Sequence, residues 1–108
     1  MTRVQYEPER YYMRVEGHAQ AVEPGQIDPV CAGVSALAFT LVAAADDTPE
    51  YHMQVYLNPA GGVVDVQCSP EDGFEDRCRY MFDIIYNGLR LIESEFAAYV
   101  KTGGAEDG

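Results

Sequence analysis

The stretch GHAQAVEPGQIDPVCAGVS, residues 17–35, decides how the rest of the chain is interpreted. Its second half has the features of a helix start, because Asp28 is a favourable N-cap, Pro29 suits the first helical position and an apolar run follows from Val30. Cys31 therefore falls in the first turn of a predicted helix. The unpaired amides and the positive end of the helix dipole favour a thiolate over a thiol at that place.

His18 precedes this helix and follows a strand-like stretch, residues 11–15. Gly17 can adopt backbone angles that other residues avoid, which allows the chain to leave the sheet there. A strand end and a helix start that are joined by a loop can face each other, and a Cys–His nucleophile pair requires that layout. The spacing alone also fits a structural interpretation, with His18 as a polar strand-end residue and Cys31 as a small core residue.

The segments GHA, residues 17–19, and DPVCAGVS, residues 28–35, resemble the signature of the ribosomal-processing cysteine proteases. Members of that family remove an N-terminal extension from a large-subunit ribosomal protein. The similarity covers most of residues 10–100, through the early strands, the helix rich in small residues and the closing amphipathic helix. Pro29 departs from the family pattern, which has a β-branched residue at that position.

The resemblance implies that Cys31 is the nucleophile and His18 its base. The sequence shows no obvious Asn or Asp as a third member, so a Cys–His dyad is expected, with no metal and no cofactor. It implies a basic protein substrate, the precursor of a large-subunit ribosomal protein, with apolar aromatic residues near the cut. In the expected reaction, the Cys31 thiolate forms an acyl-enzyme and first-turn amides stabilise the oxyanion. The loop of residues 19–27 is expected to act as a lid.

Three further residues are expected to support this pair. Asp28 is expected to fix where Cys31 points as the helix cap, and in a second role to orient His18. Ser35 lies one helical turn after Cys31, where its hydroxyl can bond within the site or back to a carbonyl of its own helix. Gly17 is expected to give the backbone its turn before His18.

The remaining histidine and the two remaining cysteines are expected to have structural roles and no catalytic role. His52 falls on the polar side of a predicted strand and is expected at the surface. Cys68 and Cys78 fall on apolar faces and are expected to be core thiols. A zinc site formed by the three cysteines and a histidine is not indicated, because the spacings lack the short paired pattern of structural zinc sites.

The chain of 108 residues is long enough for one small domain, here residues 1–102, followed by a polar tail, residues 103–108, that is expected to be disordered. The predicted fold is α+β, a small and mostly antiparallel sheet of about four strands with two helices. The strands are expected at residues 3–6, 10–16, 51–57 and 63–68, and the helices from 29 to about 45 and from a cap at Ser69 or Asp72 to about Lys101.

The first predicted helix is apolar nearly all round, which is typical of a helix that is buried on most sides. The sheet and the second helix of so small a domain cover only part of its surface. A symmetric homodimer is therefore expected, in which a second subunit covers the rest.

The net charge of −11, with only seven basic residues, argues against direct binding of nucleic acid and favours a basic polypeptide partner. We identify no signal sequence and no apolar run of about 18 residues, so a cytoplasmic protein without a membrane span is expected. Two alternatives stay open at this stage. One is a non-catalytic, acidic, dimeric binding module, and the other is a related protease with a different substrate, such as a phage structural protein.

Overall fold

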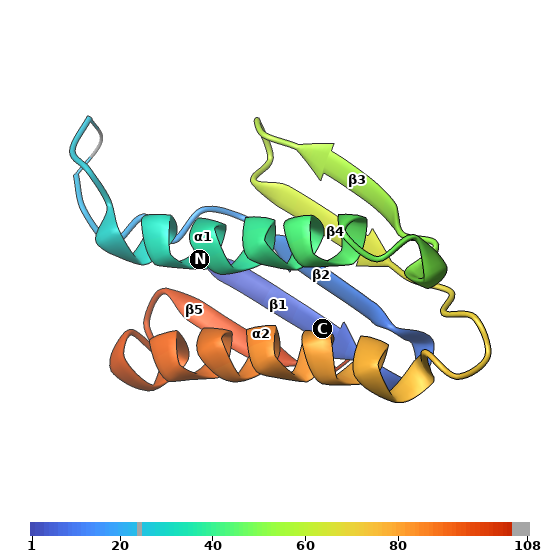
Figure 1. The fold of residues 1–108 in the computed structure, drawn as a ribbon. Helices are drawn as coiled ribbons and strands as arrows, with labels where there is room; N and C mark the ends of the chain where they lie inside the picture. Colours follow the sequence, from blue (N-terminus) through green and yellow to red (C-terminus); the bar gives the residue numbers. More distant parts are fainter. Residues whose placement is uncertain (24, 105–108) are drawn as a thin grey trace.

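The computed structural model describes residues 1–23 and 25–104. The chain forms a five-stranded sheet in the order β3-β4-β2-β1-β5, and both helices lie side by side on one face of it (Figure 1). Neighbouring strands are antiparallel except β1 and β5, which are parallel. The predicted α+β class is therefore confirmed, with one strand more than expected.

Along the chain, the two α-helices each follow a pair of antiparallel strands, and a last strand follows the second helix. The elements are β1 (Thr2–Glu7), the short 3-10 helix η1 (Pro8–Arg10), β2 (Tyr12–Glu16), α1 (Pro29–Asp46), the short 3-10 helix η2 (Pro49–Tyr51), β3 (Gln54–Asn58), β4 (Val63–Gln67), α2 (Glu75–Glu95) and β5 (Val100–Gly103). Gly103, the first residue of the predicted tail, ends β5, and residues 105–108 of that tail lie outside the described residues.

Helix α1 begins at Pro29 with Asp28 as its cap, as predicted. The expectation that α1 is buried on most sides is wrong, because both helices lie in one layer and α2 covers only one flank of α1 (Figure 1). One stripe of α1 is buried, whereas Phe39 on its outer side is 52% exposed. The buried stripe is Val30, Val34, Ala38, Leu41 and Ala45.

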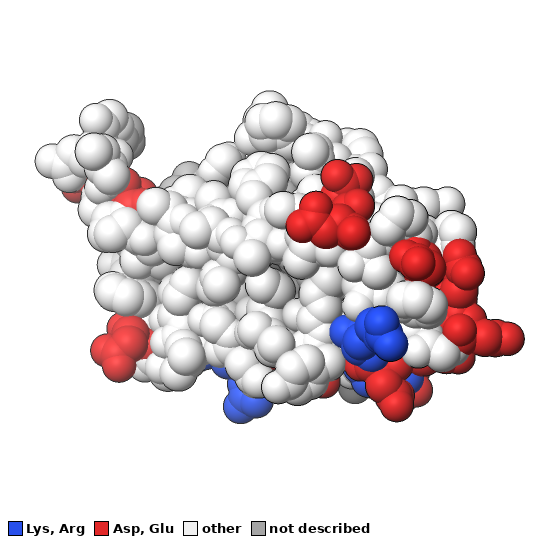
Figure 2. Space-filling view, in the orientation of Figure 1, with Lys and Arg blue, Asp and Glu red and all other residues white. Residues whose placement is uncertain are grey.

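By length and composition alone, α1 is apolar enough to cross a membrane, so the statement that the sequence has no such run is wrong. The same composition suits a helix that packs in a protein core. In this fold α1 packs along α2 and over β4. Uncharged side chains cover the middle of the helix layer, as Figure 2 shows from the side of the helices.

The predicted limits of the second helix need correction at both ends. Neither Ser69 nor Asp72 is its cap; Phe74 occupies the cap position without a side-chain hydrogen bond. The helix ends at Glu95 instead of about Lys101, and the chain returns as β5 beside β1. The spacing of apolar residues does not reveal this end, because Phe96 and Tyr99 continue the helical pattern after the helix has ended.

Backbone and side-chain contacts hold β5 in place at the sheet edge. Thr2 donates its backbone N–H to the carbonyl of Tyr99 at 2.8 Å, just before the two strands pair. The backbone N–H of Thr102 donates to the Glu93 carboxylate at 3.1 Å, and the Thr102 hydroxyl donates to the same group. Strand β5 is thus fixed to β1 on one side and to α2 on the other.

The core lies between the sheet and the helix layer, and its largest fully buried side chains include Phe82, Met13 and Leu41. Cys68 and Cys78 are also fully buried, at 1% and 0% exposure, as predicted. The hydrogen bond that the Cys68 thiol donates to Cys78, together with the burial of the side chain, raises the pKa of Cys68. Both thiols are therefore packing residues that solvent does not reach.

Strand β3 forms the free edge of the sheet next to the candidate site. Val55, Tyr56 and Leu57 are 41–55% exposed. The strand begins at Gln54 instead of residue 51, because the short helix η2 and the left-handed backbone of His52, with φ of 48°, come first. The turn after β3 brings residues 58–62 beside the end of β2.

Candidate active site

Cys31 lies half-buried in the first turn of α1, and the Asp28 carboxylate fixes this turn. One carboxylate oxygen accepts the backbone N–H groups of Val30 at 2.9 Å and of Cys31 at 3.0 Å. The other oxygen accepts the N–H of Ala21 at 2.8 Å, which ties the preceding loop to the helix start. These bonds, that of Cys31 foremost, lower the pKa of Asp28, and desolvation opposes them.

The same hydrogen bonds occupy the first-turn amides that are predicted to stabilise the oxyanion. The amides of Val30 and Cys31 both donate to the Asp28 side chain, and the amide of Ala32 donates to the Asp28 carbonyl at 2.9 Å. The amide groups of this turn are thus engaged in this structure instead of free for a substrate oxygen. Each hydrogen bond of the Asp28 carboxylate goes to the main chain and none to His18 within the described residues, so the second predicted role of Asp28 has no support here.

His18 follows Gly17 directly after β2, at the point where the chain leaves the sheet. Gly17 has φ of 95°, and a Cβ there would lie 2.5 Å from the carbonyl oxygen of Met1, so only glycine fits. The N–H of Gly17 donates to the carbonyl of Gly62 at 3.1 Å. Nε2 of the exposed His18 ring lies 3.4 Å from the carbonyl oxygen of Ala60.

Two hollows meet at His18 and Cys31, which line both of them. The first is a cavity of about 240 Å³ between α1 and the β3–β4 hairpin, with mostly apolar walls that include Phe39, Leu57 and Val64. The second is a broader hollow of about 930 Å³ against the loop, where its walls include residues 20–23, Gln26 and Asp28. No hydrogen bond joins the Cys31 thiol and the His18 ring in the described part of the chain, although both groups line the same cavity.

Ser35 and Gly17 line the first cavity together with the predicted pair. The Ser35 hydroxyl has no hydrogen-bond partner among the described residues, so it does not bond back to its own helix. Thr40 on the same helix does so, since its hydroxyl donates to the Ala36 carbonyl at 2.6 Å. Of the two alternatives for Ser35, the structure favours a hydroxyl that is available within the cavity.

A model of the family described as cysteine protease Prp matches residues 1–101. The chain belongs to this family. No curated protein sequence matches it at a significant level.

Solved structures share the fold of this cysteine protease. A structure of the essential ribosomal processing protease Prp from S. aureus, in complex with a covalently linked product peptide, is similar with a TM-score of 0.80 and 22% identity, over 96% of this chain and 99% of that one. The structure of the S. aureus protease in complex with a substrate peptide has a TM-score of 0.74 and 22% sequence identity, and the match covers 95% of this chain and 96% of that one. The structure of a protein from Streptococcus mutans has a TM-score of 0.65 and 20% sequence identity, and the match covers 84% of this chain and 79% of that one.

Membership of this protease family favours the enzyme over the non-catalytic binding module. A thiol in a solvent-accessible cavity beside an imidazole is the arrangement from which a cysteine protease draws its nucleophile and base. Cys31 is the one cysteine of the three that is not fully buried. The structure therefore brings the predicted pair together with Gly17 and Ser35 in the first cavity, and Asp28, the remaining predicted supporting residue, lines the second hollow with the same pair.

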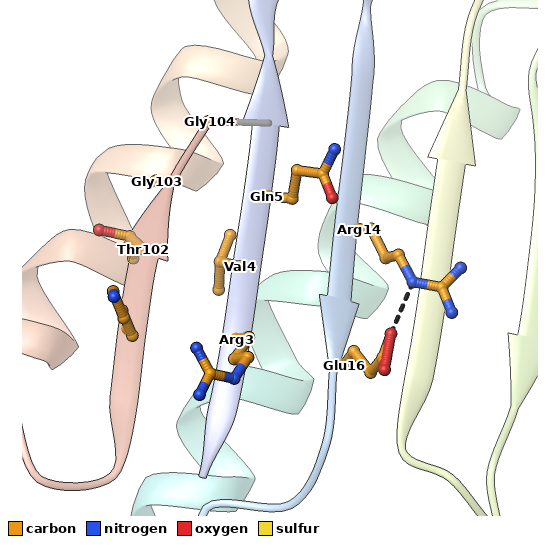
Figure 3. Close-up of a pocket in the computed structure, with 9 residues that line it drawn as sticks. Arg3, Val4, Gln5, Arg14, Glu16, Thr102, Gly103 and Gly104 are labelled. Atoms are coloured by element: carbon orange, nitrogen blue, oxygen red, sulfur yellow. Dashed lines mark hydrogen bonds and ion pairs between the residues drawn. The ribbon is translucent and has the colours of Figure 1, made fainter. Parts of the chain in front are cut away.

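A separate hollow of about 200 Å³ lies on the face of the sheet that is turned away from the helices, over β1, β2 and β5 (Figure 3). Its walls include Arg3, Arg14 and Lys101. The Arg14 guanidinium pairs with Glu16 at 2.8 Å and with Asp65 at 2.9 Å, so its charge is compensated. This hollow shares no lining residue with the two at Cys31 and is not part of the candidate site.

The turn of residues 58–62 is the part of the site that the sequence interpretation did not identify. The sequence predicts this turn from its Asn-Pro-Ala-Gly-Gly composition, but the contact between Ala60 and His18 spans 42 residues along the chain. Such a contact arises only because β4 pairs with β2. A glycine pair after Pro59 is the one local signal of a closely packed turn.

We expect Asp28→Ala to lower the melting temperature by several degrees and to slow cleavage, because the cap and its tie to Ala21 are lost. The lowered pKa of Asp28 means that its contribution to stability is complete above its ordinary value of 3.8 and is lost as the pH falls through the lowered value. The difference in melting temperature from the unsubstituted protein should therefore be constant between neutral pH and about pH 4, and should shrink below it.

Asp28→Asn is the matched control, because the amide oxygen still accepts from the first turn of α1 while the amide nitrogen cannot accept from Ala21. The melting temperature of Asp28→Asn should therefore lie between those of Asp28→Ala and the unsubstituted protein. Thermal unfolding followed by circular dichroism measures both. Equal melting temperatures for Asp28→Ala and the unsubstituted protein at neutral pH would contradict the capping argument.

Proposed function

We propose that this chain is an endopeptidase that removes a short N-terminal extension from the precursor of a large-subunit ribosomal protein, with Cys31 as nucleophile and His18 as base. The observation that carries the proposal is the shared cavity. In a chain of the cysteine protease Prp family, the half-exposed thiol at the start of α1 and the imidazole at the end of β2 line the same hollow.

In the proposed reaction His18 takes the thiol proton of Cys31, and the sulfur attacks the carbonyl carbon of the scissile bond. The tetrahedral intermediate collapses when His18 returns the proton to the leaving amine, which leaves the acyl group on Cys31. Water then attacks the thioester with His18 again as base, which releases the acid and restores the thiol. The hydroxyl of Ser35, which has no hydrogen-bond partner among the described residues, lines the same cavity and is the proposed hydrogen-bond donor to a substrate oxygen there.

The two hollows support a substrate of mixed character. The apolar cavity beside Cys31 suits apolar side chains near the cut. The broader hollow on the other side is lined by polar and acidic groups, among them Glu23 and Asp28. Together with the net charge of −11, this side suits a basic polypeptide segment. The S. aureus structures, whose protein is described as a ribosomal processing protease, were solved with a substrate or a product peptide.

A homodimer in the cytoplasm completes the proposal. Tyr80, Ile84 and Leu91, at helical spacing along one face of α2, are 54–70% exposed, and Phe39 of α1 is 52% exposed. Apolar side chains of this size in one helix layer suit a subunit contact. The three cysteines are free thiols, as expected in a reducing compartment.

The dimer is tested by sedimentation velocity on the unsubstituted protein and on Ile84→Glu. We expect a dimer for the first and a shift to monomer for the second, because a carboxylate in an apolar contact loses its hydration. Arg90→Glu on the exposed side of the same helix is the control for the added charge. A monomer at all concentrations of the unsubstituted protein would overturn the dimer.

The function is tested by incubating the protein with the large-subunit ribosomal protein precursor of its own source, followed by mass analysis. The expected result is one cut that removes a short N-terminal segment, and none with mature ribosomal protein. Cleavage of a phage structural protein instead, with the precursor left intact, would assign the substrate to the other predicted class. No cleavage of either would overturn the proposal.

A further inference from the structure

We propose that the main-chain carbonyl of Ala60, in the β3–β4 turn, is the group that orients His18, and that Gly62 is a positioning residue that holds this turn against the ring. The proposal rests on the proposed function, because it assigns a partner to the His18 base. In many enzymes with a nucleophile and a base, a third side chain, often a carboxylate or an amide, orients the base. Here a backbone carbonyl oxygen would take that place.

The hydrogen-bond contacts of the His18 ring indicate that Ala60 is the group that orients it. Nε2 lies 3.4 Å from the Ala60 carbonyl oxygen, which is the hydrogen-bond partner of this ring in the described part of the chain. The Asp28 carboxylate accepts from the backbone N–H groups of Val30, Cys31 and Ala21, and none of its hydrogen bonds within the described residues goes to the His18 ring. The orienting role thus falls to the turn and not to an acidic residue.

A carbonyl oxygen can only accept a hydrogen bond, and this fixes the chemistry of the ring. Nε2 must carry the proton that it donates to Ala60, so the neutral ring has its lone pair on Nδ1. Nδ1 is then the atom that takes the proton of the Cys31 thiol and returns it to the leaving amine. In the cationic ring Nε2–H still donates to the carbonyl, so the same bond stabilises the charge that forms during the reaction.

Backbone bonds of the turn keep the Ala60 carbonyl in place. The N–H of Gly62 donates to the Pro59 carbonyl at 3.2 Å, and the N–H of Gly61 donates to the Asn58 side chain at 3.2 Å. The carbonyl of Gly62 in turn accepts the N–H of Gly17 at 3.1 Å, which joins the turn to the residue before His18. The turn and the ring are therefore positioned as one unit.

Gly62 is the point of closest approach in this unit. A Cβ on Gly62 would lie 2.8 Å from the carbonyl oxygen of Gly17 and 3.1 Å from Cε1 of His18, and the backbone there has φ of 65°. A side chain at this position would push the turn away from the ring. Gly61 differs, because a Cβ there would meet atoms of Asn58 and Val63 at 3.5 Å and 3.6 Å, which is ordinary contact.

The first experiment measures the tautomer directly in the unsubstituted protein. The chain has two histidines, so ¹⁵N labelling of the rings gives two sets of signals, and His52→Gln assigns them. At a pH at which both rings are neutral, we expect the Nε2–H tautomer for His18. A His18 ring that is mainly the Nδ1–H tautomer would overturn the proposal, whatever the protein cleaves.

The second experiment compares Gly62→Ala with Gly61→Ala in the cleavage assay. We expect kcat to fall by roughly 10- to 100-fold in Gly62→Ala at nearly unchanged KM, because the ring is displaced from the sulfur while the substrate walls remain. The population of the His18 Nε2–H tautomer should fall with it, and Gly61→Ala should stay within about twofold of the unsubstituted protein. Equal kcat values and equal tautomer signals in both variants would overturn the positioning role of Gly62.

The ring measurement separates this proposal from the proposed function. If the unsubstituted protein shows the Nε2–H tautomer but cleaves no ribosomal precursor, the substrate assignment fails and the positioning role stands. If Gly62→Ala does not fold, a His18 ring that is mainly the Nδ1–H tautomer in the unsubstituted protein would still overturn the orienting role of Ala60.

Discussion

Replacing Cys31 by Ala is expected to lower kcat/KM for the precursor at least about 10³-fold, to the level of the uncatalysed background. The thiol is the attacking group in the proposed mechanism, and alanine has no atom that can form the acyl-enzyme. The fold should remain, because the sulfur is half-buried and makes no hydrogen bond among the described residues. The backbone N–H of residue 31 keeps its bond to Asp28 in the variant.

Cys68→Ala is the matched control, since its thiol is buried in the core and touches neither hollow. We expect Cys68→Ala to keep its cleavage rate while it loses some stability. Labelling with iodoacetamide offers a second measurement, in which the native unsubstituted protein should take up one label at Cys31 before the buried thiols react. Normal processing by Cys31→Ala would remove the nucleophile assignment.

The start of α1 shows what the sequence predicts well. An N-cap, a proline at the first helical position and an apolar run are local signals, and the structure has Asp28, Pro29 and Val30 in those places. The placement of Cys31 in the first turn follows from the same signals. The pattern of the strands β1, β2 and β4 is likewise local, because alternation marks a strand with one buried face.

The parts that the sequence did not predict depend on contacts between distant segments. The helical spacing of Phe96 and Tyr99 predicts that the last helix continues to about Lys101, and only the pairing of β5 with β1 shows that the chain returns to the sheet there. The exposed side of α1 follows from the single helix layer, which composition does not reveal. The approach of Ala60 to His18 needs the pairing of β2 with β4 as well as the hairpin.

The second large effect is expected for His18→Ala, for which kcat should fall by roughly 10²- to 10⁴-fold with little change in KM. Two losses add in this variant. The thiol proton of Cys31 has no acceptor in the cavity, and the leaving amine has no donor when the tetrahedral intermediate collapses. The His18 side chain is exposed and its contact with Ala60 is at the surface, so the melting temperature should change little.

His52→Ala is the matched control, because His52 is the other histidine of the chain and its exposed ring pairs with Glu71 at 2.7 Å, outside both hollows. Steady-state cleavage and the rate of iodoacetamide labelling should be measured for both variants across neutral pH. Labelling of Cys31 should slow in His18→Ala and stay unchanged in His52→Ala, since only His18 shares a cavity with the thiol. Superimposable cleavage and labelling profiles for the two variants would show that His18 does not act on Cys31, and the base would then have to be sought on the loop of residues 19–27 or in solvent.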